Sequence, residues 1–164
     1  MTIAKDFIAN STLRMNESFD RVSNCLNRIE NNQVWQSPNP STNSIGHLIL
    51  HLNGNISQYI LKGLGDISYQ RQRDLEFNSI DHISKESLED IWSSLIDRSI
   101  QVVENLSKDQ LTSIYNIQGF KLSGTGVIIH VVEHLSYHVG QIALLTKLFK
   151  NEDLRFYDGL DLNL

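Results

Sequence analysis

The sequence predicts an all-α protein, a four-helix bundle, and three observations support this fold class. Apolar residues recur at intervals of three and four over four long segments, which is the spacing of amphipathic helices. Only one short stretch, residues 110–122, shows the imperfect alternation of a strand. The 164 residues are enough for one domain with a single core. We therefore expect residues 1–164 to form one domain, a four-helix bundle.

The first predicted helix covers residues 5–30 and ends before a loop. Its apolar residues at helical spacing are Phe7, Ile8, Leu13, Met15, Phe19, Val22, Leu26 and Ile29. Pro38 and Pro40, the two prolines of the chain, follow it and indicate a loop. The second helix therefore begins after them, with an N-cap within residues 41–44, and stops near the glycines of residues 63–65.

Residues 66–83 are polar, and we expect an ordered connection with a short turn of helix that crosses one end of the bundle. His82, in this stretch, has no histidine at helical spacing and is expected to be a solvated loop residue. A third helix is expected from Ser84 to about Leu106, because apolar residues again recur at three and four.

The last part of the chain is expected to contain one irregular stretch, one long helix and a packed tail. Residues 110–122 favour a short extended segment or a hairpin, interrupted at Gly119. The fourth helix starts within residues 123–126 and runs to about Lys150. We expect the tail, residues 151–164, to pack back on the bundle because it carries several large apolar side chains.

The fourth helix carries three of the six histidines, His130, His134 and His138, spaced four apart. Residues i and i+4 of a helix lie about 40° apart around its axis. On a helical wheel, His134 and His138 point into the apolar stripe, and His130 lies at its edge. A buried polar group without a partner costs about 1–3 kcal/mol. A metal ion shared by the imidazoles supplies a partner, and two core histidines with ordinary hydrogen bonds are the alternative.

The second helix carries the pair His47 and His51. His51 flanks the apolar stripe of this helix, and His47 lies about 40° further out. Three histidines on successive turns of one helix span about 12 Å along its axis, which is too far to share one ion. A third ligand must therefore come from another helix, and we favour His51 with His134 and His138. The helical pairs His130–His134 and His47–His51 are the alternatives, with the remaining histidines beside the ligands or on the flanking surface.

Three further polar side chains can face the same region, namely Asn55, Tyr59 and Gln141. They can orient a bound ligand or water, or complete a buried polar network. Glu133 falls on a different helical face and is expected to be a solvated surface charge rather than a general base. The histidines also do not form the HExxH motif of zinc proteases, because the residue after His134 is Leu135.

Composition excludes several classes of protein. The net charge of −5 is modest and forms no basic stripe, so we expect no nucleic-acid partner. The single cysteine, Cys25, excludes an internal disulfide framework and is expected to be a small buried hydrophobe. The first 25 residues lack the apolar core of a signal peptide, and no apolar run approaches the roughly 20 residues that span a bilayer. We therefore expect a cytoplasmic protein without a membrane partner.

Two segments resemble the DinB/YfiT-like superfamily of metalloenzymes, and more closely an uncharacterised bacterial branch of it. They are SIGHLILHL at residues 44–52 and HVVEHLSYHVGQI at residues 130–142. Residues 74–77, 117–120 and 156–157 also look like that branch, so the similarity covers nearly the whole chain.

The resemblance implies a bundle with up-down-down-up connectivity, often dimeric, and a metal site with one histidine from the second helix and two from the fourth. On this sequence they are His51, His134 and His138. The chain departs from the family pattern at Val139, where a small or basic residue is usual, and this leaves the ligands unchanged. Three imidazoles accept several divalent transition metals, and we expect zinc or nickel.

Characterised proteins of this superfamily imply the leading function, a metal-dependent thiol S-transferase. Its partners would be a small-molecule thiol and an electrophile, and Asn55, Tyr59 and Gln141 would line the pocket. Metal-assisted hydrolysis is a second enzymatic hypothesis. A non-catalytic metal-binding or stress-related interaction protein is a third, and a bundle with core histidines and no metal is the fourth.

Overall fold

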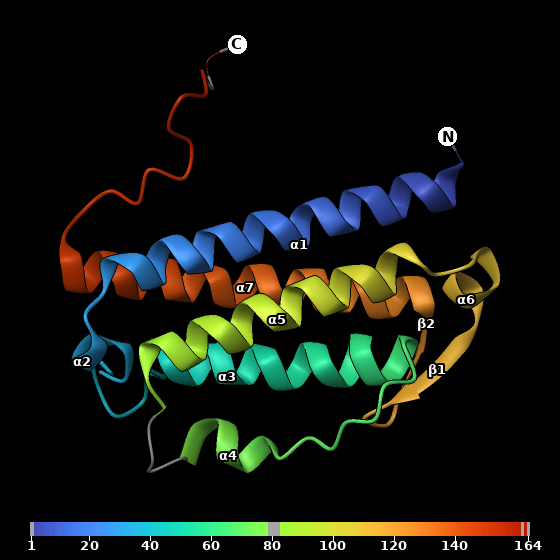
Figure 1. Cartoon of the computed structure of the whole chain (residues 1–164), viewed down its shortest axis with the longest axis horizontal. Helices are drawn as coiled ribbons and strands as arrows, with labels where there is room; N and C mark the ends of the chain where they lie inside the picture. Colours follow the sequence, from blue (N-terminus) through green and yellow to red (C-terminus); the bar gives the residue numbers. More distant parts are fainter. Residues whose placement is uncertain (1, 79–82, 162, 164) are drawn as a thin grey trace.

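The structure is a computed structural model that describes residues 2–78, 83–161 and 163. Within these ranges four long helical segments lie side by side (Figure 1): α1 (Ile3–Arg28), α3 (Ile45–Ile56) continued by η1 (Ser57–Leu64), α5 (Lys85–Glu104) and α7 (Gly124–Lys150). The predicted all-α four-helix bundle is confirmed. In Figure 1, α1 and α7 run in one direction and α3 and α5 run in the opposite direction.

The second long helix changes its hydrogen-bond pattern halfway along. It begins at Ser44, whose side chain accepts a hydrogen bond from the backbone N–H of His47 at 3.2 Å. From Ser57 to Leu64 it is a π-helix, η1. A π-helix adds a residue to each turn and is frequent near functional sites. The hydrophobic spacing predicted the extent of this helix but not the change within it.

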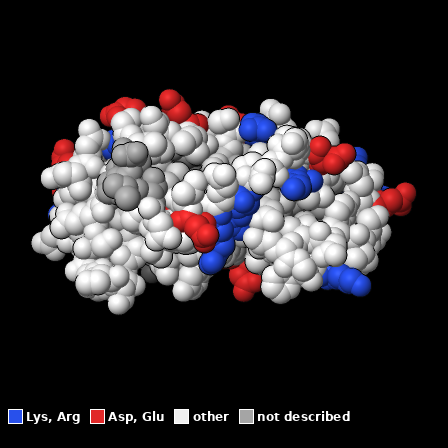
Figure 2. Space-filling view, turned by 90° about the horizontal axis from the view of Figure 1, so that it is seen from below, with Lys and Arg blue, Asp and Glu red and all other residues white. Residues whose placement is uncertain are grey.

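The sequence suggested that the connection after η1 crosses one end of the bundle, and this prediction is wrong. Because α3 and α5 run in the same direction, the chain must return along the length of the bundle before α5 begins (Figure 1). It does so beside α3 and forms the short helix α4 (Arg73–Asn78). Figure 2 shows the face with this connection, where acidic and basic side chains stand next to each other. The expectation for His82 lies outside the described residues.

The chain between α5 and α7 forms a short hairpin, one of the two forms that the sequence favoured. After the short helix α6 (Lys108–Thr112), β1 (Ile114–Ile117) pairs with β2 (Phe120–Ser123) in antiparallel register. Gln118 and Gly119 form the turn with φ angles of 53° and 83°, a backbone region that favours glycine. The turn places Gln118 beside η1, where Tyr59 Oη donates a hydrogen bond to its Oε1 at 3.1 Å.

The core contains apolar side chains from all four long helices and from α2 (Asn31–Val34). Cys25 is fully buried, as expected. The tail packs on the bundle over only part of its length, since Leu154 is 1 % exposed and Leu160 is 64 % exposed. Leu162 lies outside the described residues. Of the helices in the described ranges, none is both long enough and apolar enough to cross a bilayer.

Gly54 allows the connection to lie directly against α3. A methyl group at this position would overlap Glu76 Oε1, and it would lie 2.8 Å from Glu76 Cδ and 3.0 Å from Arg71 Nε. Both charged residues belong to the returning connection. Gly140, by contrast, lies exposed in α7 with no atom of the described residues within 4 Å of an added methyl.

The two glycines should therefore respond in opposite ways to the same substitution. Gly140→Ala should raise the free energy of unfolding by about 0.5–1 kcal/mol, because alanine favours a helix more than glycine does. Gly54→Ala should lower it by about 1–3 kcal/mol, because the methyl overlaps a packed neighbour. Chemical denaturation of both variants after metal chelation measures this difference. Equal stabilisation by both substitutions would contradict the close contact between α3 and α4.

Candidate metal centre

Three histidines from two helices converge on one point inside the bundle. His51 comes from α3, and His134 and His138 come from successive turns of α7. One ring nitrogen from each lies within 4.8 Å of the others. His51 Nε2 and His134 Nε2 are 3.0 Å apart. Two nitrogens bound tetrahedrally at 2.0–2.1 Å from zinc must lie about 3.3 Å apart, so the donor atoms fit an ion of this kind.

The structure brings together the three histidines that the sequence favoured, and His47 and His130 do not join their group. His47 is held elsewhere, since its Nδ1 lies 2.9 Å from Ser44 Oγ and its ring packs edge-on against Trp35. His130 lies one turn from His134 and packs against Tyr59, with ring centroids 4.5 Å apart. Neither belongs to the group whose nitrogens share one centre.

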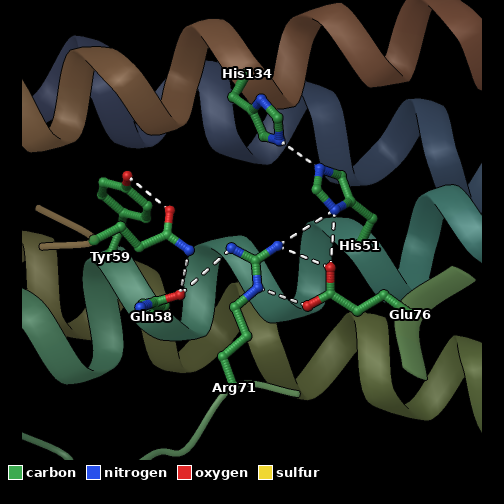
Figure 3. A network of polar contacts seen from close by, with 7 residues as sticks. His51, Gln58, Tyr59, Arg71, Glu76 and His134 are labelled. Atoms are coloured by element: carbon green, nitrogen blue, oxygen red, sulfur yellow. Dashed lines mark hydrogen bonds and ion pairs between the residues drawn. The ribbon is translucent and has the colours of Figure 1, made fainter. Parts of the chain in front are cut away.

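His51 is oriented by a buried carboxylate. Its Nδ1 donates a hydrogen bond to Glu76 Oε2 at 2.9 Å, which leaves Nε2 directed at His134 (Figure 3). Metal-binding histidines commonly donate their other ring N–H to a carboxylate, which fixes the tautomer and the ring orientation. Phe77 packs against the same ring with centroids 5.0 Å apart. Thus Glu76 and Phe77 of α4 hold the ring of His51 in its orientation.

Glu76 is itself paired with Arg71. Arg71 Nε and Nη2 donate to the two carboxylate oxygens at 2.6 and 2.8 Å, and both side chains are more than nine-tenths buried. The polar contacts continue from Arg71 through Gln58 and Gln118 to Tyr59 (Figure 3). The network therefore links the histidines to the hairpin turn.

Sequence reasoning missed Glu76 and Arg71 as site residues, because a polar stretch normally indicates a solvated connection. Gly54 was the available signal, since a glycine in the middle of a helix often marks a close approach of another segment. The position of Glu76 opposite that glycine could not be read from local spacing.

The three predicted pocket residues have different positions. Gln141 orients a ligand, since its Oε1 accepts a hydrogen bond from His138 Nδ1 at 2.7 Å and leaves His138 Nε2 free for coordination. Asn55 and Tyr59 follow His51 along its helix and are 5 % and 1 % exposed. Asn55 Oδ1 has no hydrogen-bond partner among the described residues.

The environment favours the neutral, metal-binding form of the imidazoles on α7. Burial, followed by the neighbouring histidines, lowers the pKa of His134 from 6.5 to about 4. Burial also lowers the pKa values of His138 and His130. For Glu76, burial opposes the charged form, but hydrogen bonds from Arg71 and His51 outweigh it and lower the pKa of the carboxyl. At neutral pH the site thus combines neutral imidazoles on α7 with an ionised carboxylate on α4.

Comparison with solved structures shows that this bundle has the fold of DinB-like proteins. A DinB-like protein from Bacillus cereus matches with a TM-score of 0.67 at 16 % identity, covering 87 % of this chain and 90 % of its own. The DinB-like protein YjoA from Bacillus subtilis matches with a TM-score of 0.70 at 14 % identity, covering 90 % and 96 %. A conserved protein from Enterococcus faecalis matches with a TM-score of 0.72 at 11 % identity, covering 93 % and 99 %.

The fold relationship to DinB-like proteins that the sequence suggested is thereby confirmed. The chain belongs to the family described as a protein of unknown function, DUF1572, whose profile matches residues 2–158. Comparison with curated proteins gave no significant match.

The lowered histidine pKa values predict a loss of stability in mild acid. Unfolded His134 takes up its proton near pH 6.5, whereas the folded residue does so only near pH 4. Between these values the unfolded chain binds more protons than the folded chain, so the free energy of unfolding decreases as the pH falls. The chelated protein should therefore melt at a lower temperature at about pH 5 than at about pH 7.5.

The matched variant is His134→Leu, which removes the imidazole whose pKa is lowered to about 4. Its melting temperature should fall less across the same pH range. An equal fall in both proteins would show that a neutral, buried His134 is not the source of the pH dependence.

Proposed function

We propose that this protein is a metal-dependent thiol S-transferase that acts on small electrophiles. The observation that carries the proposal is the group of three buried or partly buried imidazoles from α3 and α7, each able to offer one nitrogen to a common centre. Three protein nitrogens with one open position are typical of catalytic zinc sites, whereas structural sites are closed by four protein ligands. Zinc and nickel are the expected ions.

The residues of the chain hold and orient this centre. Glu76 fixes the ring of His51, and Gln141 fixes the ring of His138. A divalent ion bound there would lower the pKa of a thiol at the open position and so make it a nucleophile at neutral pH. In the transfer, a carbon–sulfur bond forms at the electrophile, the leaving group departs with its bonding electron pair, and the thiol proton passes to solvent.

The arrangement of carboxylates favours a thiol over water as the nucleophile. A general base assists the attack of water. The carboxylate that contacts the histidines, Glu76, has both oxygens engaged by Arg71 and His51. Glu133 is exposed on another face of α7. A thiol with a lowered pKa loses its proton before the reaction and does not depend on such a base.

The test is a transfer assay with zinc- or nickel-loaded protein, 2-mercaptoethanol or cysteine as the thiol, and 1-chloro-2,4-dinitrobenzene as the electrophile. We expect thiol-dependent loss of the electrophile above the uncatalysed rate. His134→Ala should reduce it to that background, because a ligand is lost. His47→Ala, a histidine outside the centre, should retain it.

Two results would point to the other hypotheses. Turnover of ester or amide substrates without any thiol would support metal-assisted hydrolysis instead. Stoichiometric metal binding without turnover of a broad panel of electrophiles would support a non-catalytic metal-binding protein.

A further inference from the structure

Two buried polar atoms beside the histidine cluster have no hydrogen-bond partner among the described residues. They are Asn55 Oδ1 on α3 and His130 Nε2 on α7. Asn55 comes four residues after His51, and His130 comes four residues before His134. Because α3 and α7 run in opposite directions (Figure 1), both lie one turn from the cluster towards the same end of the bundle. One turn corresponds to about 5.4 Å along the axis.

Contacts on both sides place Asn55 within the interface between α3 and α7. On one side, His51 meets His134 at 3.0 Å between their Nε2 atoms. On the other side, the ring of Tyr59 packs on the ring of His130 with centroids 4.5 Å apart. Asn55 lies between His51 and Tyr59 in the sequence and is 5 % exposed. Its side chain is therefore buried one helical turn from His51, beside the candidate metal centre.

Buried polar atoms without a hydrogen-bond partner lower the free energy of unfolding, so folding alone does not account for this pair. Each costs about 1–3 kcal/mol of stability relative to a hydrogen-bonded group. Most buried polar groups of native proteins have a partner, and exceptions commonly mark a ligand or an ordered water. The other buried side-chain atoms without a hydrogen-bond partner among the described residues, Glu89 Oε1, Trp92 Nε1 and Ser99 Oγ, all lie on α5.

We propose that Asn55 and His130 bind a hydroxyl group of the thiol substrate. The substrate is then a small thiol that carries a hydroxyl about three carbons from its sulfur. A hydroxyl both donates and accepts hydrogen bonds. It can donate to Asn55 Oδ1 and accept from His130 Nε2–H, which satisfies both atoms at once. A three-carbon spacer spans about one helical turn, the separation between these two residues and the histidine cluster. The inference rests on the proposed function for the position of the sulfur.

The experiment compares two thiols of equal size by isothermal titration calorimetry of the zinc-loaded protein. They are 3-mercaptopropan-1-ol and butane-1-thiol, which carries a methyl in place of the hydroxyl. The wild-type protein should bind the hydroxyl thiol about tenfold more tightly, because butane-1-thiol leaves both polar atoms unpaired.

Two substitutions remove these polar atoms while keeping the approximate shape. Asn55→Leu removes Oδ1 together with Nδ2, and His130→Phe removes both ring nitrogens but retains a ring that packs on Tyr59. Each should reduce the preference for the hydroxyl thiol, because one of its two hydrogen-bond partners is lost. Asn53→Leu is the matched control, since Asn53 lines a separate cavity of about 450 Å³ beside Asp90 and Arg98, and it should keep the preference.

Thermal melting of the same variants after chelation separates a binding role from a structural one. Because each substitution removes a buried polar atom without a partner, the melting temperature should stay the same or rise. A marked fall for both variants would show that these atoms have structural partners and would overturn the inference.

The other outcomes distinguish this inference from the proposed function. Equal affinity of the wild-type protein for the two thiols would overturn the inference and indicate that water binds these two atoms, while thiol binding at the cluster would stand. Failure of both thiols to bind would overturn the proposed function and the inference with it. The comparison in the wild-type protein holds even if a variant does not fold.

Discussion

The buried carboxylate of Glu76 is the interaction on which the rest of the site depends. A carboxylate removed from water must be paired, and removing one partner of a buried pair typically costs 3–5 kcal/mol. Arg71 and His51 supply the partners here. One group thereby fixes the returning connection against α3 and orients the histidine that faces α7. Gly54 makes the approach possible, since any larger residue would occupy the space of the carboxylate. The connection between two helices is thus part of the site.

The fold was largely predictable because its helices are amphipathic. Hydrophobic spacing located all four long segments, and the turn at Gly119 indicated the hairpin. Two features could not be predicted in this way. The π-helix of residues 57–64 changes the backbone hydrogen-bond register without breaking the apolar pattern. The path of the connection depends on the relative direction of α3 and α5, which is a property of the whole bundle rather than of any local stretch.

The site was predictable where helix geometry determines it. Spacing by four put His134 and His138 on one inward face, and His51 was the inward histidine of a second helix. The residues that orient the histidines could be predicted from the sequence only in part. Gln141 lies one turn from the ligand that it orients, so local spacing indicated it. Glu76 and Arg71 lie in a polar stretch, and their burial follows from their pairing with each other and with His51. Local spacing carries no information on such long-range pairing.

The central claim is that His51, His134 and His138 hold one divalent metal ion between two helices of the bundle. Elemental analysis of the natively purified protein, beside the variants His51→Ala, His134→Ala and His47→Ala, tests it most directly. The account predicts about one metal ion per chain in the wild-type protein and in His47→Ala, with loss of the ion in the other two variants. Absence of metal, with no uptake of added zinc or nickel by the folded wild-type protein, would contradict it.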